Sequence, residues 1–329
     1  MTNFDQLFKD FNELKVVIIG DVMLDTYWWG QVDRISPEAP VPVVALQRKE
    51  HRVGGAANVA LNTVALGAQT TIVSVIGTDP DGVLLQSLFE AQHIDTSYLL
   101  THDSRITTNK TRVMSRNQQM MRLDAEITTP ISSDIEKVLL QKFTFCLDAK
   151  KPDVVIFEDY DKGVLTPTCI KAAIAACLER NIVMSVDPKK NNFLAYKGVT
   201  LFKPNLKEVK EGLQVPIASV TLENLRAVHA ALQTHLAHQI SLITLSEKGM
   251  FFDTGDTAKI IPTHVRSIAD VSGAGDTVIA VASLVYAATK NIELATEMAN
   301  IAGGLVCEEV GTAAINKTRL LAECKLLLA

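Results

Sequence analysis

The sequence predicts an α/β protein of three layers, in which helices cover both faces of a central, mostly parallel sheet. Short aliphatic and β-branched runs alternate with longer segments of helical period along most of the chain. This alternation is typical of βαβ units, whose crossover helices lie on the faces of a parallel sheet. No internal repeat, low-complexity tract or long linker divides the chain, so we expect one domain over residues 1–329.

Six short runs have the composition and length of buried strands. They are Lys15–Ile19, Thr71–Ile76, Asp153–Phe157, Ile182–Val186, Val199–Phe202 and Ser241–Leu245. Seven longer segments have the apolar spacing of helices. They are Ala56–Leu66, Gly82–Ala91, Ser132–Leu147, Pro167–Arg180, Leu222–His238, Ala274–Thr289 and Ile292–Glu309.

Two segments, residues 27–52 and 101–126, interrupt this rhythm. Both are rich in β-forming residues and in alternating charge, and neither has a helical period. Pro37, Pro40 and Pro42 in the first segment suit a turn or the edge of a sheet and not a central strand. We therefore expect a small inserted β-sheet that acts as a lid, and we expect a homodimer in which its apolar face pairs with a second copy of the chain.

Composition narrows the classes of partner. The net charge of −5 and the aromatic share of 5% argue against a nucleic-acid partner, because a phosphate backbone requires a basic excess. The five cysteines are scattered without a CxxC pair, which favours a reducing compartment over disulfides or zinc. The apolar runs are too short to cross a bilayer, and the N-terminus has no signal-peptide pattern. We therefore expect a cytoplasmic protein with no membrane partner.

Polar residues follow five of the six expected strands. They are Gly20-Asp21, Glu158-Asp159, Asp187-Pro188-Lys189, Lys203-Pro204-Asn205 and Ser246-Glu247. Ligands of open parallel sheets bind beyond the carboxyl ends of the strands, so these residues predict a polar cleft for metal and phosphate. Any single Asp at such a position is equally explained as a helix N-cap or a turn residue.

The strongest local signal is the segment Asp270-Val-Ser-Gly-Ala-Gly-Asp276-Thr, which opens onto an apolar helix. Gly273, Ala274 and Gly275 place unpaired N–H groups at the positive end of the helix dipole, where an anion binds. Such donors stabilise the charge of a phosphoryl group during transfer. Asp276, in the first turn, could accept a proton as a general base. The alternative is a tight turn followed by a favourable first-turn acid.

A second glycine-rich stretch, Val53-Gly54-Gly55-Ala-Ala-Asn58, also opens a helix. It could bring backbone and the Asn58 amide against sugar hydroxyls, although close packing of a helix on the sheet explains the same small residues. Asp21 and Asp25 lie four residues apart around an expected turn. Paired acids in this arrangement suit the recognition of vicinal hydroxyls.

These two signatures, Gly54-Gly55 with Asn58 and Asp270-x-x-Gly-Ala-Gly-Asp276, resemble those of the ribokinase-like (PfkB) carbohydrate kinases. Further motifs, such as Asp159-Tyr-x-Lys-Gly163 and Asp187-Pro-Lys189, are similar to the kinase half of bacterial heptose-7-phosphate kinase/adenylyltransferases. The likeness runs from about Lys15 to Ile315. It implies a three-layer ribokinase-like fold with a β-lid.

The resemblance implies transfer of the ATP γ-phosphate to the anomeric hydroxyl of D-glycero-D-manno-heptose 7-phosphate, giving the 1,7-bisphosphate used for lipopolysaccharide. It implies ATP and Mg²⁺ as cofactors and leaves a K⁺ requirement open. It makes Asp276 the base and Gly273, Ala274 and Gly275 the anion hole. The positions that it assigns to ATP and Mg²⁺ are Asn205, Leu206, Lys207, Glu208 (the metal ligand), Ser246, Gly249 and Asn300. The positions that it assigns to the sugar are Asp21, Asp25, Gly54, Gly55 and Asn58.

The 7-phosphate of such a substrate requires cations. Our candidates are Arg112, Arg116, Arg122 and Lys162, because arginine gives bidentate phosphate geometry. Charges that are simply solvated on the lid are the alternative for at least two of them. Asp187 and Lys189 are further substrate candidates, with a basic surface pair as the alternative for the lysine.

One departure from the bifunctional relatives concerns their second activity. Those proteins continue into an adenylyltransferase with an HxGH-type motif, which this sequence lacks. We therefore expect phosphorylation only, with a separate adenylyltransferase as a candidate partner in the same pathway. The competing interpretations are a kinase for another sugar, sugar phosphate or nucleoside, and a non-catalytic sugar or nucleotide sensor. A sensor would tolerate loss of the base or the anion hole, and this sequence has both.

Overall fold

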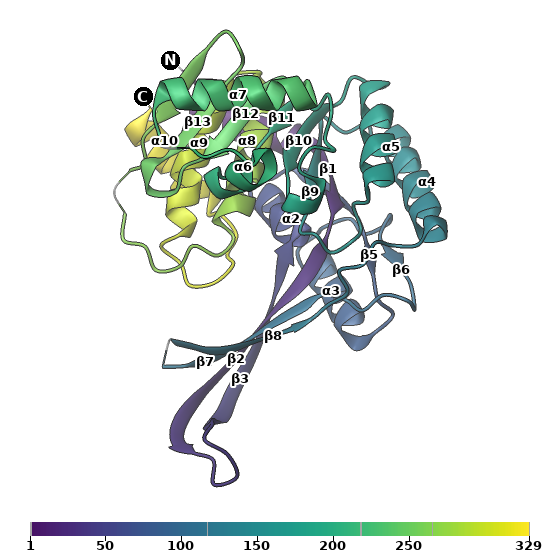
Figure 1. Cartoon of the computed structure of the whole chain (residues 1–329), viewed down its shortest axis with the longest axis vertical. Helices are drawn as coiled ribbons and strands as arrows, with labels where there is room; N and C mark the ends of the chain where they lie inside the picture. The colour runs from purple at the N-terminus through teal and green to yellow at the C-terminus, as the bar shows by residue number, and fades with distance from the viewer. Residues whose placement is uncertain (1, 117, 218, 265, 329) are drawn as a thin grey trace.

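The computed structural model describes residues 2–116, 118–217, 219–264 and 266–328. A large α/β body carries a long four-stranded sheet that extends away from it (Figure 1). Residue 117, within the segment 101–126, lies outside the described residues. In the part of the chain that is described, no helix is both long and apolar enough to cross a bilayer.

The central sheet of the body has eight strands in the order β14-β13-β12-β11-β10-β9-β1-β4. The strands from β12 to β4 are parallel to their neighbours, and β13 and β14 are antiparallel. Their bounds are β1 (Lys15–Gly20), β4 (Gln69–Val73), β9 (Val154–Glu158), β10 (Val183–Asp187), β11 (Leu201–Phe202), β12 (Ile240–Thr244), β13 (Met250–Asp253) and β14 (Ala258–Ile261).

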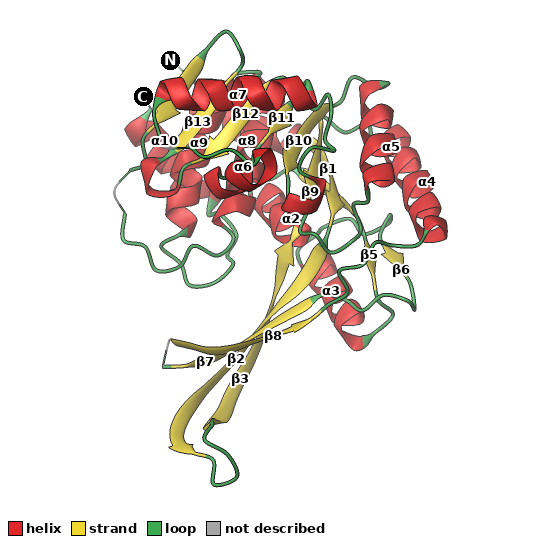
Figure 2. Cartoon of the chain, in the orientation of Figure 1, coloured by secondary structure: helices red, strands yellow, loops and turns green. Residues whose placement is uncertain are grey.

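Helices cover both faces of this sheet (Figure 2). One face carries α1 (Phe4–Asp10), α2 (Ala56–Ala65), α3 (Pro80–Ala91), α8 (Ala274–Thr289), α9 (Ile292–Val306) and α10 (Lys317–Leu327). The other carries α4 (Ser133–Lys150), α5 (Pro167–Leu178), α6 (Leu206–Leu213) and α7 (Leu222–Leu236). Strand β1 is apolar from Val16 to Ile19 because Val16 and Ile18 pack on the first face and Val17 and Ile19 on the second. The predicted three-layer α/β fold is confirmed.

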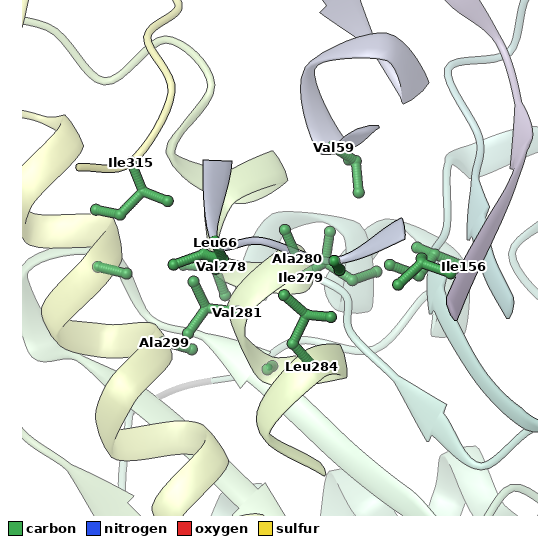
Figure 3. Packing of buried hydrophobic residues seen from close by; sticks show 14 of the residues in the cluster. Val59, Leu66, Ile156, Val278, Ile279, Ala280, Val281, Leu284, Ala299 and Ile315 are labelled. Carbon is green, nitrogen blue, oxygen red and sulfur yellow. The ribbon is translucent and has the colours of Figure 1, made fainter. Parts of the chain in front are cut away.

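Helix α8 lies at the centre of the first layer. Figure 3 shows its side chains from Val278 to Val281 packed among residues of α2, β9 and α9, including Val59, Ile156 and Ala299. All of these residues are buried. A helix held on all sides in this way has a fixed N-terminus, which matters because the glycine-rich segment precedes it.

The second sheet, which we call the lid sheet, has the strand order β3-β2-β7-β8. Its bounds are β2 (Val22–Ile35), β3 (Pro42–Gly55), β7 (Asn109–Ser115) and β8 (Gln118–Ala125). Pro37 and Pro40 lie in the connection between β2 and β3, and Pro42 begins β3 at the edge of the sheet. Proline is tolerated at these positions because no ladder hydrogen bond is lost there.

The structure contains elements that the sequence pattern did not predict, namely α1, α6, α10, β13 and β14. The run Thr71–Ile76 divides into β4 and β5 (Val75–Ile76), which pairs with β6 (Leu100–Thr101). The break falls at Ser74, whose hydroxyl donates to the carbonyl of Gly20 at 2.6 Å. Three 3₁₀ helices complete the described structure, at Phe11–Glu13, Lys190–Asn192 and Ser246–Lys248.

The lid sheet is attached to the body near the end of α9. The Arg52 guanidinium on β3 donates to the carbonyls of Val310 and Thr312 at 2.8 and 2.9 Å. Gly311 lies between these two residues with φ 75°, and a Cβ on it would come within 2.8 Å of both Arg52 Nη1 and the Tyr27 hydroxyl. Glycine at this position therefore lets the lid sheet approach the body closely.

Candidate active site

The glycine-rich segment begins α8 beyond the carboxyl ends of the parallel strands. Gly273 is the N-cap of α8 in the left-handed conformation, with φ 78°. A Cβ at Gly273 would lie 2.7 Å from Asn58 Nδ2, so glycine satisfies both the backbone and the close approach. The N–H of Ala274 donates to Val271 O at 3.3 Å, whereas helix geometry leaves the next N–H groups without intrahelical acceptors.

Asp276 is the buried carboxylate at this helix start, with 4% of its surface exposed. Asn58 Nδ2 on α2 donates to Asp276 Oδ2 at 2.7 Å, and the Tyr160 hydroxyl donates to Asp276 Oδ1 at 2.6 Å. Burial raises the pKa of Asp276 to about 6, and the hydrogen bonds from Tyr160 and Asn58 oppose this rise. A carboxylate with such a pKa is charged at neutral pH and is a stronger base than an exposed aspartate.

Two further carboxylates lie beside Asp276. Glu158, Asp187 and Asp276 have oxygens within 4.8 Å of one another, and all three residues are buried. Among the described residues, neither oxygen of Glu158 has a hydrogen-bond partner. Burial raises the pKa of Glu158 well above its usual range, and Asp187 and Asp276 add to the effect. This oxygen set could hold a hard divalent cation, which would supply the missing partner for Glu158.

Two lysines counter part of this negative charge. The Asp187 carboxylate pairs with Lys203 at 2.8 Å and with Lys189 at 3.3 Å. Lys189 also pairs with Glu208 at 2.9 Å. Burial alone would lower the pKa of Lys189, but Asp187 and Glu208 outweigh it and raise that pKa. Both ammonium groups are therefore held charged beside Asp276.

The residues assigned to nucleotide and magnesium begin α6. Asn205 is the N-cap, and it forms a capping box with Glu208, each side chain bonding the other's backbone N–H at 2.8 Å. Leu206 and Lys207 form the first turn. One Glu208 oxygen thus caps the helix and the other contacts Lys189. The magnesium role of Glu208 stays a prediction.

The other nucleotide positions lie around the ends of β12 and β14. Ser246, with φ 55°, begins the 3₁₀ helix after β12. Gly249 has φ 95°, and a Cβ on it would meet the Ile261 carbonyl at 2.0 Å. Asn300 on α9 donates to Pro262 O at 2.8 Å. These residues shape the loops next to α8, and their contacts with ATP stay predictions.

Asp21 organises the loop after β9. Its carboxylate accepts hydrogen bonds from the backbone N–H groups of Tyr160, Lys162 and Val164 at 2.9–3.1 Å. Burial raises the pKa of Asp21 to about 6, and the nearby Asp159 adds to the rise. Asp21 is 1% exposed, and because its carboxylate accepts from the Tyr160 N–H it positions Tyr160. Its predicted contact with the sugar stays untested.

Asp25 lies on the face of the lid sheet that is turned toward the body. It pairs with Arg112 Nη1 at 2.5 Å. A Cβ at Gly54 would lie 2.4 Å from Asp25 Oδ2, so glycine makes room for this carboxylate. Gly55, with φ 60°, then begins α2 and brings Asn58 to Asp276.

The other phosphate candidates are spread along the lid. Arg116 lies at its tip, 74% exposed, with Asp33 3.8 Å away, and Arg122 forms two hydrogen bonds with Asp124. Lys162 lies in the loop after β9 and pairs with Glu126 at 2.9 Å. Arg112 and Lys162 therefore lie near the body, while Arg116 lies away from Asp276.

Sequence reasoning gave no role to four residues of the site. Tyr160 lies inside the quoted Asp159–Gly163 motif but received no role, and Glu158 and Lys203 were noted only as strand-end residues. Lys110 on β7 had no sequence signal. Its ammonium lies over the Tyr160 ring, 5.5 Å from the centroid, and that of Lys189 lies 5.0 Å from the same centroid.

A cavity of about 640 Å³ lies farther out, between the lid sheet and the body. Trp29, Arg48 and Arg52 line it from the lid, and Asp270 and Val310 from the body. Asp270 accepts hydrogen bonds from Ser272 and from the Gly311 N–H. The cavity is thus contiguous with the start of the glycine-rich segment, although Asp276 does not line it.

Comparison with known proteins identifies the family. Residues 13–319 match the pfkB family of carbohydrate kinases, and the chain belongs to that family. The predictions of a ribokinase-like fold and of an ATP-dependent carbohydrate kinase are confirmed.

Curated relatives include the bifunctional protein HldE of Geobacter metallireducens, 39% identical over 323 residues, 97% of this chain and 64% of the relative. The bifunctional protein HldE of Trichlorobacter lovleyi is 39% identical over 324 residues, 98% of this chain and 65% of the relative. The chain therefore spans about two thirds of the length of these relatives.

Two solved structures share the fold at low sequence identity. Phosphofructokinase-2 from Escherichia coli in complex with potassium superposes with a TM-score of 0.77 at 16% identity, covering 95% of this chain and 99% of that one. Ribokinase from Arabidopsis thaliana complexed with ribose and ATP superposes with a TM-score of 0.71 at 17% identity, covering 94% and 98%. These two likenesses support the fold of this chain and do not indicate its substrate.

The hydrogen bond from Tyr160 leads to a prediction about pH dependence. If Asp276 is the base, activity falls as the pH drops through about 6, where its carboxylate takes up a proton. Tyr160→Phe removes a donor that favours the charged form, so the pKa of Asp276 rises. We expect the acid limb of kcat/KM to move up by about 0.5–1 pH unit, the equivalent of one net hydrogen bond.

Tyr196→Phe is the matched control. Tyr196 is buried and donates to the carboxylate of Asp159 at 2.7 Å, so this variant loses an equivalent bond that does not involve Asp276. Its acid limb should stay where the parent's is. Coincident limbs for the parent and Tyr160→Phe would contradict the role of Asp276.

Proposed function

We propose that the chain is a sugar-phosphate kinase that transfers the ATP γ-phosphate to the anomeric hydroxyl of D-glycero-D-manno-heptose 7-phosphate. The observation that carries this proposal is the buried Asp276, held by Asn58 and Tyr160 at the start of α8. The likeness to the HldE proteins, together with the lid motifs, supports a phosphorylated heptose as the substrate.

The proposed step needs one proton acceptor and one anion site. Asp276 accepts the proton of the sugar hydroxyl while the hydroxyl oxygen bonds to the γ-phosphorus. The bond between the γ-phosphorus and the β-phosphate oxygen then breaks, which releases ADP. N–H groups at the start of α8, among them that of Gly275, stabilise the charge on the transferring phosphoryl oxygens. The burial of Asp276 increases its basicity for this purpose.

Magnesium is the divalent cation that we propose to accompany ATP. Its role would be to neutralise phosphate charge, and Glu208 and the Glu158–Asp187–Asp276 group are the residues that could bind it. Lys189 and Lys203 would face the same phosphates. Potassium is included among the cations to test because the E. coli phosphofructokinase-2 structure contains it.

We also propose that the chain is a homodimer that pairs through the lid sheet. The face of the lid turned away from the body exposes Met121 by 55% and Leu123 by 46%. In sedimentation velocity the parent should therefore run as a dimer. The double variant Met121→Asp/Leu123→Asp should run as a monomer of unchanged secondary structure, because the added charges oppose burial of this face between two copies. A parent that sediments as a monomer at tens of micromolar would contradict this proposal.

A substrate panel tests the proposed reaction. The chain is incubated with ATP, Mg²⁺ and individual sugars, sugar phosphates and nucleosides, and products are assigned by ³¹P NMR. We expect one new phosphate at the anomeric position of heptose 7-phosphate, and a kcat about 10²–10⁴-fold lower for Asp276→Asn. Transfer to a nucleoside or to a non-anomeric hydroxyl, or no transfer at all, would overturn the assignment.

A further inference from the structure

Lys110 is a cation of the lid sheet for which the described part of the chain provides no ion-pair partner. The other basic groups nearby are paired: Arg112 with Asp25, Arg122 with Asp124 and Lys162 with Glu126. Within the described residues, no carboxylate forms an ion pair with Lys110, and its ammonium lies over the Tyr160 ring.

The surroundings of Lys110 are partly closed to water. Burial lowers the pKa of Lys110, and the neighbouring Lys162 adds to the lowering. The acids Asp25, Glu126 and Asp124 oppose this lowering, and each contacts another cation. An ammonium group that is half desolvated and beside a second one is stabilised most by an anion from outside the chain.

Lys110 is linked to Asp276 through Tyr160. It lies opposite Asp25 on β2, so both side chains belong to the face of the lid sheet that is turned toward the body. The Tyr160 ring beneath its ammonium donates its hydroxyl to Asp276. One tyrosine thus contacts the lid ammonium with its ring and Asp276 with its hydroxyl.

A sugar-phosphate kinase holds two anions, the phosphates of ATP and the phosphate of the sugar. The γ-phosphate of ATP belongs at the start of α8 on the body, next to Lys189 and Lys203. Lys110 comes from the lid, together with Asp25, which was assigned to the sugar. The anion placed to contact Lys110 is therefore the phosphate group of the sugar substrate.

We propose that Lys110 binds the phosphate group of a phosphorylated sugar substrate and so selects sugar phosphates over free sugars. The inference rests on the proposed function and replaces the more distant Arg116 in that role. Arg122, engaged by Asp124, is likewise displaced as a candidate.

The test compares steady-state kinetics of the full chain and three variants. Lys110→Met removes the charge at similar length, Lys110→Arg keeps it, and Lys49→Met is the matched control. Lys49 is also a lid lysine over an aromatic ring, 5.0 Å from the Trp28 centroid. It pairs with Trp28 on the opposite face of the sheet from Asp25. KM and kcat are measured for ATP, heptose 7-phosphate and unphosphorylated heptose.

We expect Lys110→Met to raise KM for heptose 7-phosphate by about 10- to 100-fold, the effect of losing one charged hydrogen bond. KM for ATP and the kcat/KM for free heptose should change less than about twofold, Lys110→Arg should recover most of the loss, and Lys49→Met should match the parent.

Three results would overturn the inference. A higher KM for ATP would place Lys110 on the nucleotide, and an equal loss on both sugars would place its effect on Tyr160 and Asp276. An unchanged KM for heptose 7-phosphate would remove it from substrate binding. If the parent itself transfers no phosphate to any sugar phosphate, the proposed function fails first, which the parent's own kinetics show before any variant is compared.

Discussion

The two hydrogen bonds to Asp276 are the interaction on which the rest of the site depends. They join α2, the loop after β9 and α8, whose contributing residues lie more than a hundred positions apart. Gly273 and Gly55 have positive φ angles that bring Asn58 and the helix start together. Asp21 fixes the loop that presents Tyr160. The buried carboxylate thus has two defined donors and a raised pKa, as a base for a hydroxyl requires.

Charge in the site is unbalanced in the absence of ligands. Four acids, Glu158, Asp187, Glu208 and Asp276, meet two lysines, Lys189 and Lys203, and the Glu158 oxygens have no described partner. On the lid side the excess charge is positive, at the Lys110 ammonium. A site of this kind favours a cation near Glu158 and an anion near Lys110, which is how a metal-nucleotide and a sugar phosphate would divide it.

Much of the architecture could be predicted because local and tertiary signals agree. Alternating apolar runs gave the strands and helices of the body, and α8 begins at Ala274 as its glycines predict. Asp276 could be singled out as a candidate base because a helix start imposes its chemistry within a few residues. Tyr160 and Lys110 were not singled out, because their contacts join residues far apart in the sequence, Tyr160 with Asp276 and Lys110 with Tyr160. Asn58 illustrates the limit, because the sequence suggested a contact with the sugar, whereas in the structure its amide donates to Asp276.

The pKa of Asp276 is the quantity that most directly tests this account. It can be measured by ¹³C NMR of the chain labelled at the aspartate γ-carboxyl, with the Asp276→Asn spectrum identifying the resonance. The account predicts a midpoint at about pH 6, raised by burial against the pull of Tyr160 and Asn58. A midpoint near the ordinary value of 3.8 would show that the carboxylate is solvated, and would contradict a buried base at the start of α8.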